Sequence, residues 1–145
     1  MIKNFFTCGI VGWCLEILFT ALHTFQKQDY KLKGNTSLWM FPIYGLATLL
    51  APLSIALNKK PVFLRGCVYT FFIFLTEFIT GKLLKKHDLC PWNYETSKYN
   101  IQGVIRLDYA PLWFAMGLLY EFILKKHQRP LILPPKTKRS YHIVS

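Results

Sequence analysis

A run of about 23 mostly apolar residues, from Val62 to Leu84, constrains this chain more than any other feature. A stretch of that length is what an α-helix needs to cross the hydrocarbon core of a bilayer. The run nevertheless contains a carboxylate, Glu77, and ends in several cations. Because an ionisable group is costly in hydrocarbon, such an acid indicates either a functional site or a buried polar contact between helices.

Three further apolar runs follow the same pattern, over residues 5–25, 38–57 and 108–124. Charged residues make up only 17% of the chain, below the roughly 25% of soluble domains. The sequence therefore predicts an all-α membrane protein. We expect a bundle of four transmembrane helices, with an interfacial aromatic loop between helices three and four that is folded and is not a fifth span. Residues 1–127 should form one domain, and residues 128–145 a basic, disordered tail.

The net charge of +11 identifies the partners that this chain favours. The Lys and Arg residues flank the apolar runs, where they contact lipid headgroups and set the orientation. We therefore expect the lipid bilayer as partner, together with a second copy or another membrane protein, and no nucleic acid. With four spans, ten of the 18 cations lie on the side of the termini, which favours cytoplasmic termini.

Helices one and three of this arrangement run parallel, which places their carboxylates at similar depth. Two further polar residues lie toward the same side, so we expect one intramembrane polar site formed by Glu16, His23, Glu77 and Asp108. The aromatic loop should cover that site with Cys90, Trp92, Asn93 and Tyr94.

Each of these residues also has a structural interpretation. The two Glu residues are as consistent with polar contacts between helices as with proton coupling, ion binding or headgroup binding. His23 is favoured as a hydrogen-bonded histidine of the bundle, and Asp108 as a helix cap. Trp92 and Tyr94 are typical interface anchors.

The remaining polar features indicate no catalysis. Glu121 is explained by an i,i+4 pair with Lys125. A metal site at His87 and Cys90 is disfavoured because no second pair of ligands is near. We therefore predict no metal, no cofactor and no enzymatic activity, and the chain has no nucleotide-binding Gly-x-x-x-x-Gly-Lys-Ser/Thr motif.

Several short motifs carry a family resemblance: Cys14-Leu15-Glu16, Ser37-Leu38-Trp39, Tyr44-Gly45, Glu77-Phe78 with Gly81, Cys90-Pro91-Trp92-Asn93-Tyr94, Gly103 to Tyr109, and Trp113. Together they resemble the transmembrane protein 229 family of animals, which in turn is similar to a bacterial group labelled putative ABC-transporter type IV. The resemblance covers residues 6–127. It implies a multi-pass membrane protein of uncharacterised activity. That family usually has Asp where this chain has Asn93, which argues against a catalytic or metal-binding role here.

Three functions are consistent with these observations. The first is a structural or accessory membrane protein that binds lipid or a partner helix. The alternative is a small permease-like transporter subunit that uses Glu16 and Glu77. An intramembrane enzyme acting on lipid is the least favoured, because no catalytic residues converge with diagnostic spacing.

Overall fold

The computed structural model describes residues 1–26, 28 and 30–128. Its elements are α1 (Ile2–Gln26), α2 (Met40–Gly45), the 3-10 helix η1 (Leu46–Leu49), α3 (Leu50–Ala56), α4 (Val62–Lys86), β1 (Asn100–Ile101), β2 (Ile105–Arg106), the 3-10 helix η2 (Leu107–Tyr109) and α5 (Ala110–Gln128). The chain is mostly helical, as predicted. The predicted tail over residues 128–145 lies outside the described residues, except for Gln128 at the end of α5.

Three helical segments in the described part of the chain are long and apolar enough to cross a membrane. They are α1, α4 and residues 107–126. With 25 residues each, α1 and α4 extend about 37 Å, more than the roughly 30 Å of hydrocarbon. Threonine hydroxyls within α4 donate to carbonyl oxygens one turn earlier, so these polar groups have partners inside their own helix. These segments identify an integral membrane protein.

The second predicted helix is not a single regular helix, and a fourth crossing is not confirmed. The sequence predicts one helix over residues 38–57, whereas the structure has α2, η1 and α3 in succession over Met40–Ala56. The 3-10 turn lies just before Pro52, which lacks an N–H for the carbonyl of Thr48 and crowds the preceding turn. The combined segment is about 27 Å long at the usual rise of each helix type.

The polar residues of α1 recur at three- and four-residue steps and share one face, formed by Trp13, Glu16, Thr20, His23 and Thr24. An extended segment, residues 33–37, runs along this face, and Phe41 of α2 contacts the ring of Trp13. Thr24 donates to the carbonyl of Lys33 at 3.2 Å, and Thr20 to that of Asn35 at 3.1 Å. Closer to the middle of α1, the indole of Trp13 donates to the carbonyl of Ser37 at 3.0 Å. The segment thus runs back along about three turns of α1. Side chains of α1 donate hydrogen bonds to its backbone carbonyls, and non-helical backbone within a membrane requires such partners.

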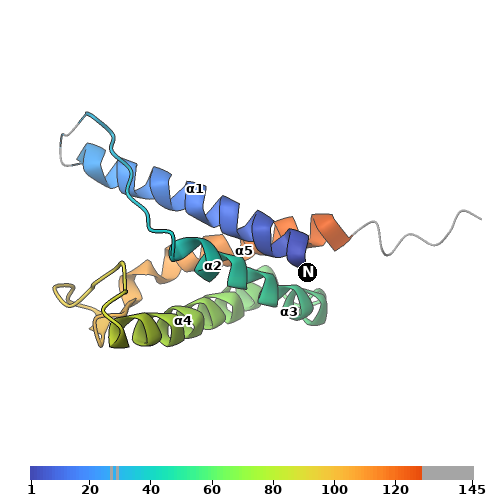
Figure 1. The fold of residues 1–145 in the computed structure, drawn as a ribbon. Coiled ribbons are helices and arrows are strands. Elements are labelled where there is room, and N and C mark those ends of the chain that lie inside the picture. Colours follow the sequence, from blue (N-terminus) through green and yellow to red (C-terminus); the bar gives the residue numbers. More distant parts are fainter. Residues whose placement is uncertain (27, 29, 129–145) are drawn as a thin grey trace, which may run out of the picture.

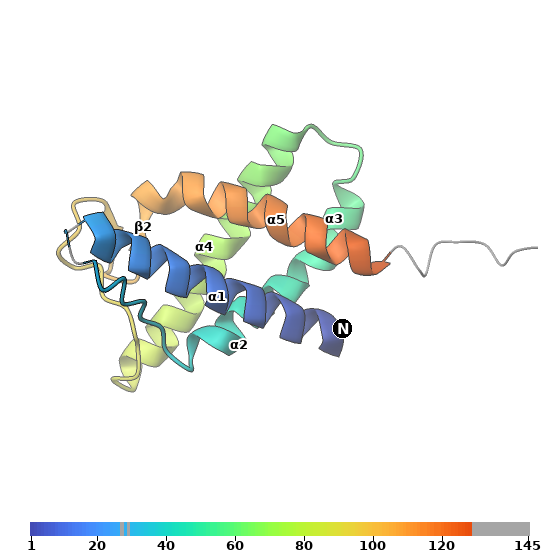
Figure 2. The ribbon, with the colours of Figure 1, turned by 90° about the horizontal axis from the view of Figure 1, so that it is seen from above.

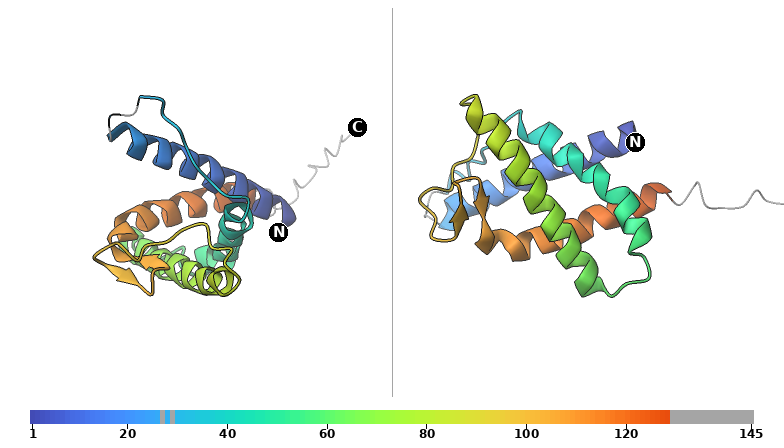
Figure 3. Two further views of the ribbon diagram at one scale, coloured as in Figure 1. Left: turned by 60° about the vertical axis from the view of Figure 1, so that its left-hand side comes forward. Right: turned by 90° about the horizontal axis from the view of Figure 1, so that it is seen from below.

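The helices form two packed pairs. α1 packs against α2, and α4 packs against α5 (Figures 1 and 2). α3 also contacts α5. Seen from below, α4 crosses α5 obliquely (Figure 3). The close approach of α4 and α5 depends on Gly66, because a Cβ there would overlap the ring of Phe114. Small residues permit such contact between helices in lipid.

The two pairs meet at one end of the molecule and diverge at the other. The buried core, formed by Cys8, Leu50, Tyr69, Tyr120 and Leu124, lies where the start of α1 meets α3 and the end of α5. α1 separates from α4 toward its own C-terminal end (Figure 1). The packing therefore leaves space between the helices on that side.

The connection from α4 to α5 is folded, as the sequence predicts, and lies at the diverging end (Figure 3). It contains a hairpin in which β1 and β2 pair antiparallel. The indole of Trp92 donates to the carbonyl of Val104 at 3.0 Å, and Val104 itself is buried. The backbone N–H of Tyr94 donates to the carbonyl of Gly103 at 2.9 Å. These bonds join Trp92 and Tyr94 to the hairpin, and Trp92 and Val104 lie beside Gly81 near the end of α4.

Candidate functional site

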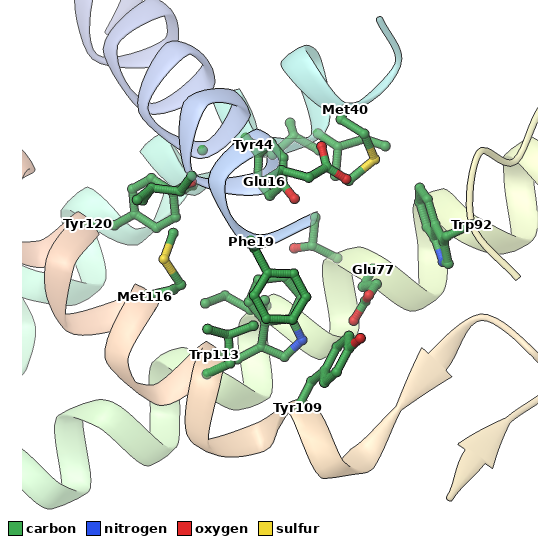
Figure 4. A pocket seen from close by; sticks show the side chains of 18 of the residues that line it. Glu16, Phe19, Met40, Tyr44, Glu77, Trp92, Tyr109, Trp113, Met116 and Tyr120 are labelled. Carbon is green, nitrogen blue, oxygen red and sulfur yellow. The ribbon is translucent and has the colours of Figure 1, made fainter. Parts of the chain in front are cut away.

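A cavity of about 1140 Å³ occupies the space between the diverging helices. Its walls come from α1, α2, η1, α3, α4 and α5, and from the connecting segments 35–37 and 91–94 (Figure 4). Most of the lining is apolar. The exceptions are two carboxylates and a set of hydroxyl, amide and aromatic side chains: Glu16, Glu77, Thr20, Asn35, Thr36, Ser37, Thr76, Tyr44, Trp92, Tyr94, Tyr109, Trp113 and Tyr120.

Glu16 enters the cavity from the middle of α1. Its Oε2 accepts a hydrogen bond of 2.6 Å from the hydroxyl of Thr36, in the segment that follows α1. Nearby, the backbone N–H of Asn35 donates to the hydroxyl of Thr20 at 2.8 Å. Glu16 is half-buried. One of its oxygens is hydrogen-bonded to the connecting segment, and the residue lines the cavity.

Glu77 enters from α4 and is the more buried of the two acids, with 9% of its surface exposed. The indole of Trp113 is a neighbouring donor on α5 (Figure 4). Neither Glu77 Oε2 nor Trp113 Nε1 has hydrogen-bond geometry with any residue that the structure describes. Buried polar groups are nearly always paired, so a buried donor and acceptor beside an open space mark a site that can receive a polar group.

Aromatic residues close the cavity at its diverging end. The rings of Tyr94 and Tyr109 meet edge to face, with centroids 5.8 Å apart, and Tyr109 meets Trp113 similarly at 6.5 Å. Burial raises the pKa of the Tyr94 phenol above its usual range, so this hydroxyl is neutral at physiological pH. Trp92 lines the same end.

The structure brings four of the eight predicted site residues to the cavity: Glu16, Glu77, Trp92 and Tyr94. The other four, His23, Asp108, Cys90 and Asn93, are not among the residues that line it.

Each residue outside the cavity has a different environment. His23 is exposed in the last turn of α1. Asp108 is exposed and forms an ion pair with Arg106 at 2.7 Å, because η2 places the two side chains on the same side of a tight turn. The thiol of Cys90 donates to the carbonyl of Trp92 at 3.2 Å. The side-chain oxygen of Asn93, Oδ1, accepts a hydrogen bond from the backbone N–H of Glu95.

Sequence reasoning missed most of the aromatic lining. Trp113 was identifiable, since it shares a helical stripe with Gly117 and Glu121. Tyr44 and Tyr109 gave no comparable signal, because a tyrosine beside an apolar run is equally typical of a lipid interface.

Glu121 lies outside this cavity, at the opposite end of the helices, and its predicted pair with Lys125 is confirmed. It has a second partner that the sequence did not indicate, Arg65 of α4, at 3.2 Å. Lys125 also donates to the side-chain oxygen of Asn58 at 2.8 Å. These contacts explain a buried carboxylate without any ligand.

Nothing in the described part of the chain gathers three or more His, Cys, Asp or Glu side chains in positions that could hold a metal ion. A family model described as "Putative ABC-transporter type IV" matches residues 3–144. The match includes every helix that lines the cavity and the loop that closes it. No solved structure matches the chain.

Proposed function

Because the chain belongs to the family described as putative ABC-transporter type IV, we propose that it is a transport-related membrane protein whose cavity binds a small amphipathic molecule. The observation that carries this proposal is the cavity of about 1140 Å³. Protein interiors are close-packed, with few voids larger than a water molecule. Pockets for small molecules typically have volumes of roughly 300–1,000 Å³, an apolar lining and a few convergent polar groups. The lining of this cavity has these properties, and its volume lies slightly above that range.

The environment of Glu77 supports binding over a purely structural role. A carboxyl group that only joins helices would have its hydrogen bonds satisfied by the neighbouring helix. In this fold, the indole of Trp113 on α5 lies beside Glu77 without full hydrogen-bond geometry to Oε2, and Glu77 lines the cavity. Glu121 is the internal comparison, since its buried carboxylate has two cationic partners, whereas the described cavity lining around Glu77 contains no Lys, Arg or His.

Photolabelling of the full-length protein in lipid nanodiscs tests whether the cavity is accessible to small molecules. The probe is the uncharged trifluoromethyl-phenyldiazirine, and labelled residues are mapped by mass spectrometry. We expect labels on Met116 and Tyr120 inside the cavity, and on Phe122, which is exposed on α5 and serves as the reference. Absence of label from the cavity residues, with Phe122 labelled, would refute the proposal.

A matched pair of substitutions gives the control. Ala47→Phe adds a ring to the cavity wall at η1 and should reduce labelling of Met116 and Tyr120 several-fold. Ala115→Phe makes the same change on an exposed face of α5 and should leave that labelling unchanged. Equal labelling in the two variants would show that the probe reaches these residues from lipid rather than through the cavity.

A subunit or accessory role is the second candidate function. The absence of a nucleotide-binding motif from the sequence favours it, because coupling to ATP would then require a separate protein. A protein that acts only through partner contacts should keep its partner when Glu16 and Glu77 are both replaced by Gln. Co-purification of cross-linked membrane partners with this double variant distinguishes the two functions.

We further propose a multi-pass topology with four crossings and cytoplasmic termini. Met40–Ala56 would be the fourth crossing, since its length of about 27 Å approaches that of the hydrocarbon core. Labelling of single cysteines from either side of sealed vesicles tests this topology. Four crossings place residues 33 and 59, which flank Met40–Ala56, on opposite sides, whereas three crossings place them on the same side.

The closer relationship to the transmembrane protein 229 family is also a proposal. It is supported by the Cys-Pro-Trp motif of Cys90–Trp92 and by Glu77-Phe78 within a membrane helix. An alignment in which those positions coincide with the motifs of that family, and not of the wider group alone, would test it.

A further inference from the structure

We propose that the ligand of this cavity is an organic cation, a molecule with an apolar body and a positively charged centre held near Glu16 and Glu77. The inference rests on the proposed binding function and specifies the chemical class of the ligand. The charge of the cavity, its aromatic lining and the buried oxygen of Glu77 each support it.

The charge of the cavity is opposite to that of the protein. The chain has 18 Lys and Arg residues against seven Asp and Glu, yet the cavity is lined by two carboxylates and by no Lys, Arg or His within the described residues. Outside the lining, the guanidinium of Arg106 lies over the ring of Tyr109, 4.5 Å from its centroid, and donates to the Tyr109 hydroxyl at 3.2 Å. Arg106 does not line the cavity, and Asp108 balances its charge. An anionic ligand would therefore have no cation to pair with.

Aromatic rings surround the same space from several directions. Trp92 comes from the loop, Tyr44 from α2 and Trp113 from α5 (Figure 4). Tyr94 of the loop also lines the cavity. The faces of aromatic rings attract cations, and rings grouped around a site are a recognised way to bind quaternary ammonium groups. The attraction is strongest where water is excluded.

The unpaired oxygen of Glu77 adds a specific place for the charge. Its Oε2 is buried, lines the cavity and lacks a hydrogen bond within the described residues. A cation beside that oxygen would offset the cost of burying the carboxylate, which an apolar or anionic ligand would leave in place. Glu16 contributes less, because Thr36 already donates to one of its oxygens.

A pair of probes with the same shape and opposite charge tests this proposal. Tetraphenylphosphonium and tetraphenylborate both carry four phenyl rings around a central atom, and differ in the sign of the charge. Binding of each to the full-length protein in nanodiscs of digalactosyldiacylglycerol, an uncharged lipid without an ammonium group, is measured by protection of Met116 and Tyr120 from the uncharged diazirine. We expect the phosphonium to protect both residues and the borate to leave them labelled.

Substitutions then locate the charge requirement. Glu77→Gln should weaken phosphonium binding at least about tenfold, and Glu16→Gln should weaken it by a smaller factor. Glu95→Gln removes the same charge from an exposed loop position and should change binding less than about twofold. Unchanged diazirine labelling of each variant without ligand shows that the cavity is intact.

The outcomes separate this inference from the function on which it rests. Protection by the borate equal to that by the phosphonium, or equal binding by Glu77→Gln and the wild type, would overturn the cation proposal while the cavity remained a binding site. Failure of the diazirine itself to label the cavity would overturn the binding function as well.

One further arm identifies the source of the cation. A lipid headgroup and a soluble molecule can both supply a quaternary ammonium. Phosphatidylcholine added to the nanodiscs should weaken phosphonium binding if the choline headgroup occupies the site. Unchanged binding would identify a soluble organic cation. The described cavity lining favours this result, because it contains no Lys, Arg or His to pair with a lipid phosphate.

Discussion

Replacing Glu121 by Gln should destabilise the protein far more than removing either of its cationic partners. Glu121 is 4% exposed, and its carboxylate contacts Arg65 at 3.2 Å and also pairs with Lys125. Glu121→Gln leaves two cations without their common anion. Breaking a buried ion pair by removing one partner typically costs about 3–5 kcal/mol. Because both cations retain some access to solvent, we expect a loss of about 3 kcal/mol in the free energy of unfolding.

The partners should rank by their burial. The Arg65 side chain is 18% exposed and that of Lys125 is 31% exposed. Arg65→Met should therefore cost about 1–2 kcal/mol, because Lys125 still compensates the charge of Glu121. Lys125→Met removes a partly exposed i,i+4 pair and should cost about 0.5 kcal/mol.

Unfolding in mixed micelles of dodecylmaltoside and increasing dodecyl sulfate, followed by circular dichroism, measures these differences. Lys85→Met serves as the control, because its pair with Glu95 is exposed and should contribute little. The ion-pair argument is refuted if Glu121→Gln unfolds within 0.5 kcal/mol of the wild type, or if Lys125→Met costs more than Arg65→Met.

Three further predictions concern the cavity and the hairpin. Gly12→Leu should lower diazirine labelling of Tyr120, because a side chain at Gly12 would overlap the Tyr120 hydroxyl at the cavity wall. Gly103→Ala should weaken the hairpin by about 1 kcal/mol, since Gly103 has a φ of +68°, and limited proteolysis of the loop should become faster. Hydrogen bonds from Lys85 and Asn93 lower the pKa of Glu95, so its contribution to the hairpin is present above pH 4.5 and is lost as pH falls through the lowered value. Amide exchange in the hairpin should accelerate over that range, and Lys85→Met should reduce the pH dependence.

The sequence by itself determined the local features of this protein. The apolar runs that form α1, α4 and α5 are long enough to identify membrane helices, because helix formation and hydropathy depend on residues close together in the chain. The pair of Glu121 and Lys125 is local for the same reason, since four residues make one helical turn. That the loop before α5 is folded also followed from its composition.

Only the tertiary structure decided which distant side chains meet. Glu16 and Glu77 line one cavity because the two helix pairs diverge there, while Cys8, Leu50 and Leu124 pack together at the other end. Asp108 does not join them, because it is exposed and pairs with Arg106, two residues earlier in the chain.

The segment over residues 38–57 and the polar face of α1 also show features that the sequence pattern does not predict. Hydropathy predicts an apolar segment over residues 38–57 but does not distinguish a regular helix from one tightened before Pro52. Likewise, the periodic polar residues of α1 indicate a buried face without indicating that residues 33–37 cover it. Crossing angles, helix distortions and the course of connecting segments arise from packing between parts of the chain that are far apart in sequence, and a periodic pattern carries no information about that packing.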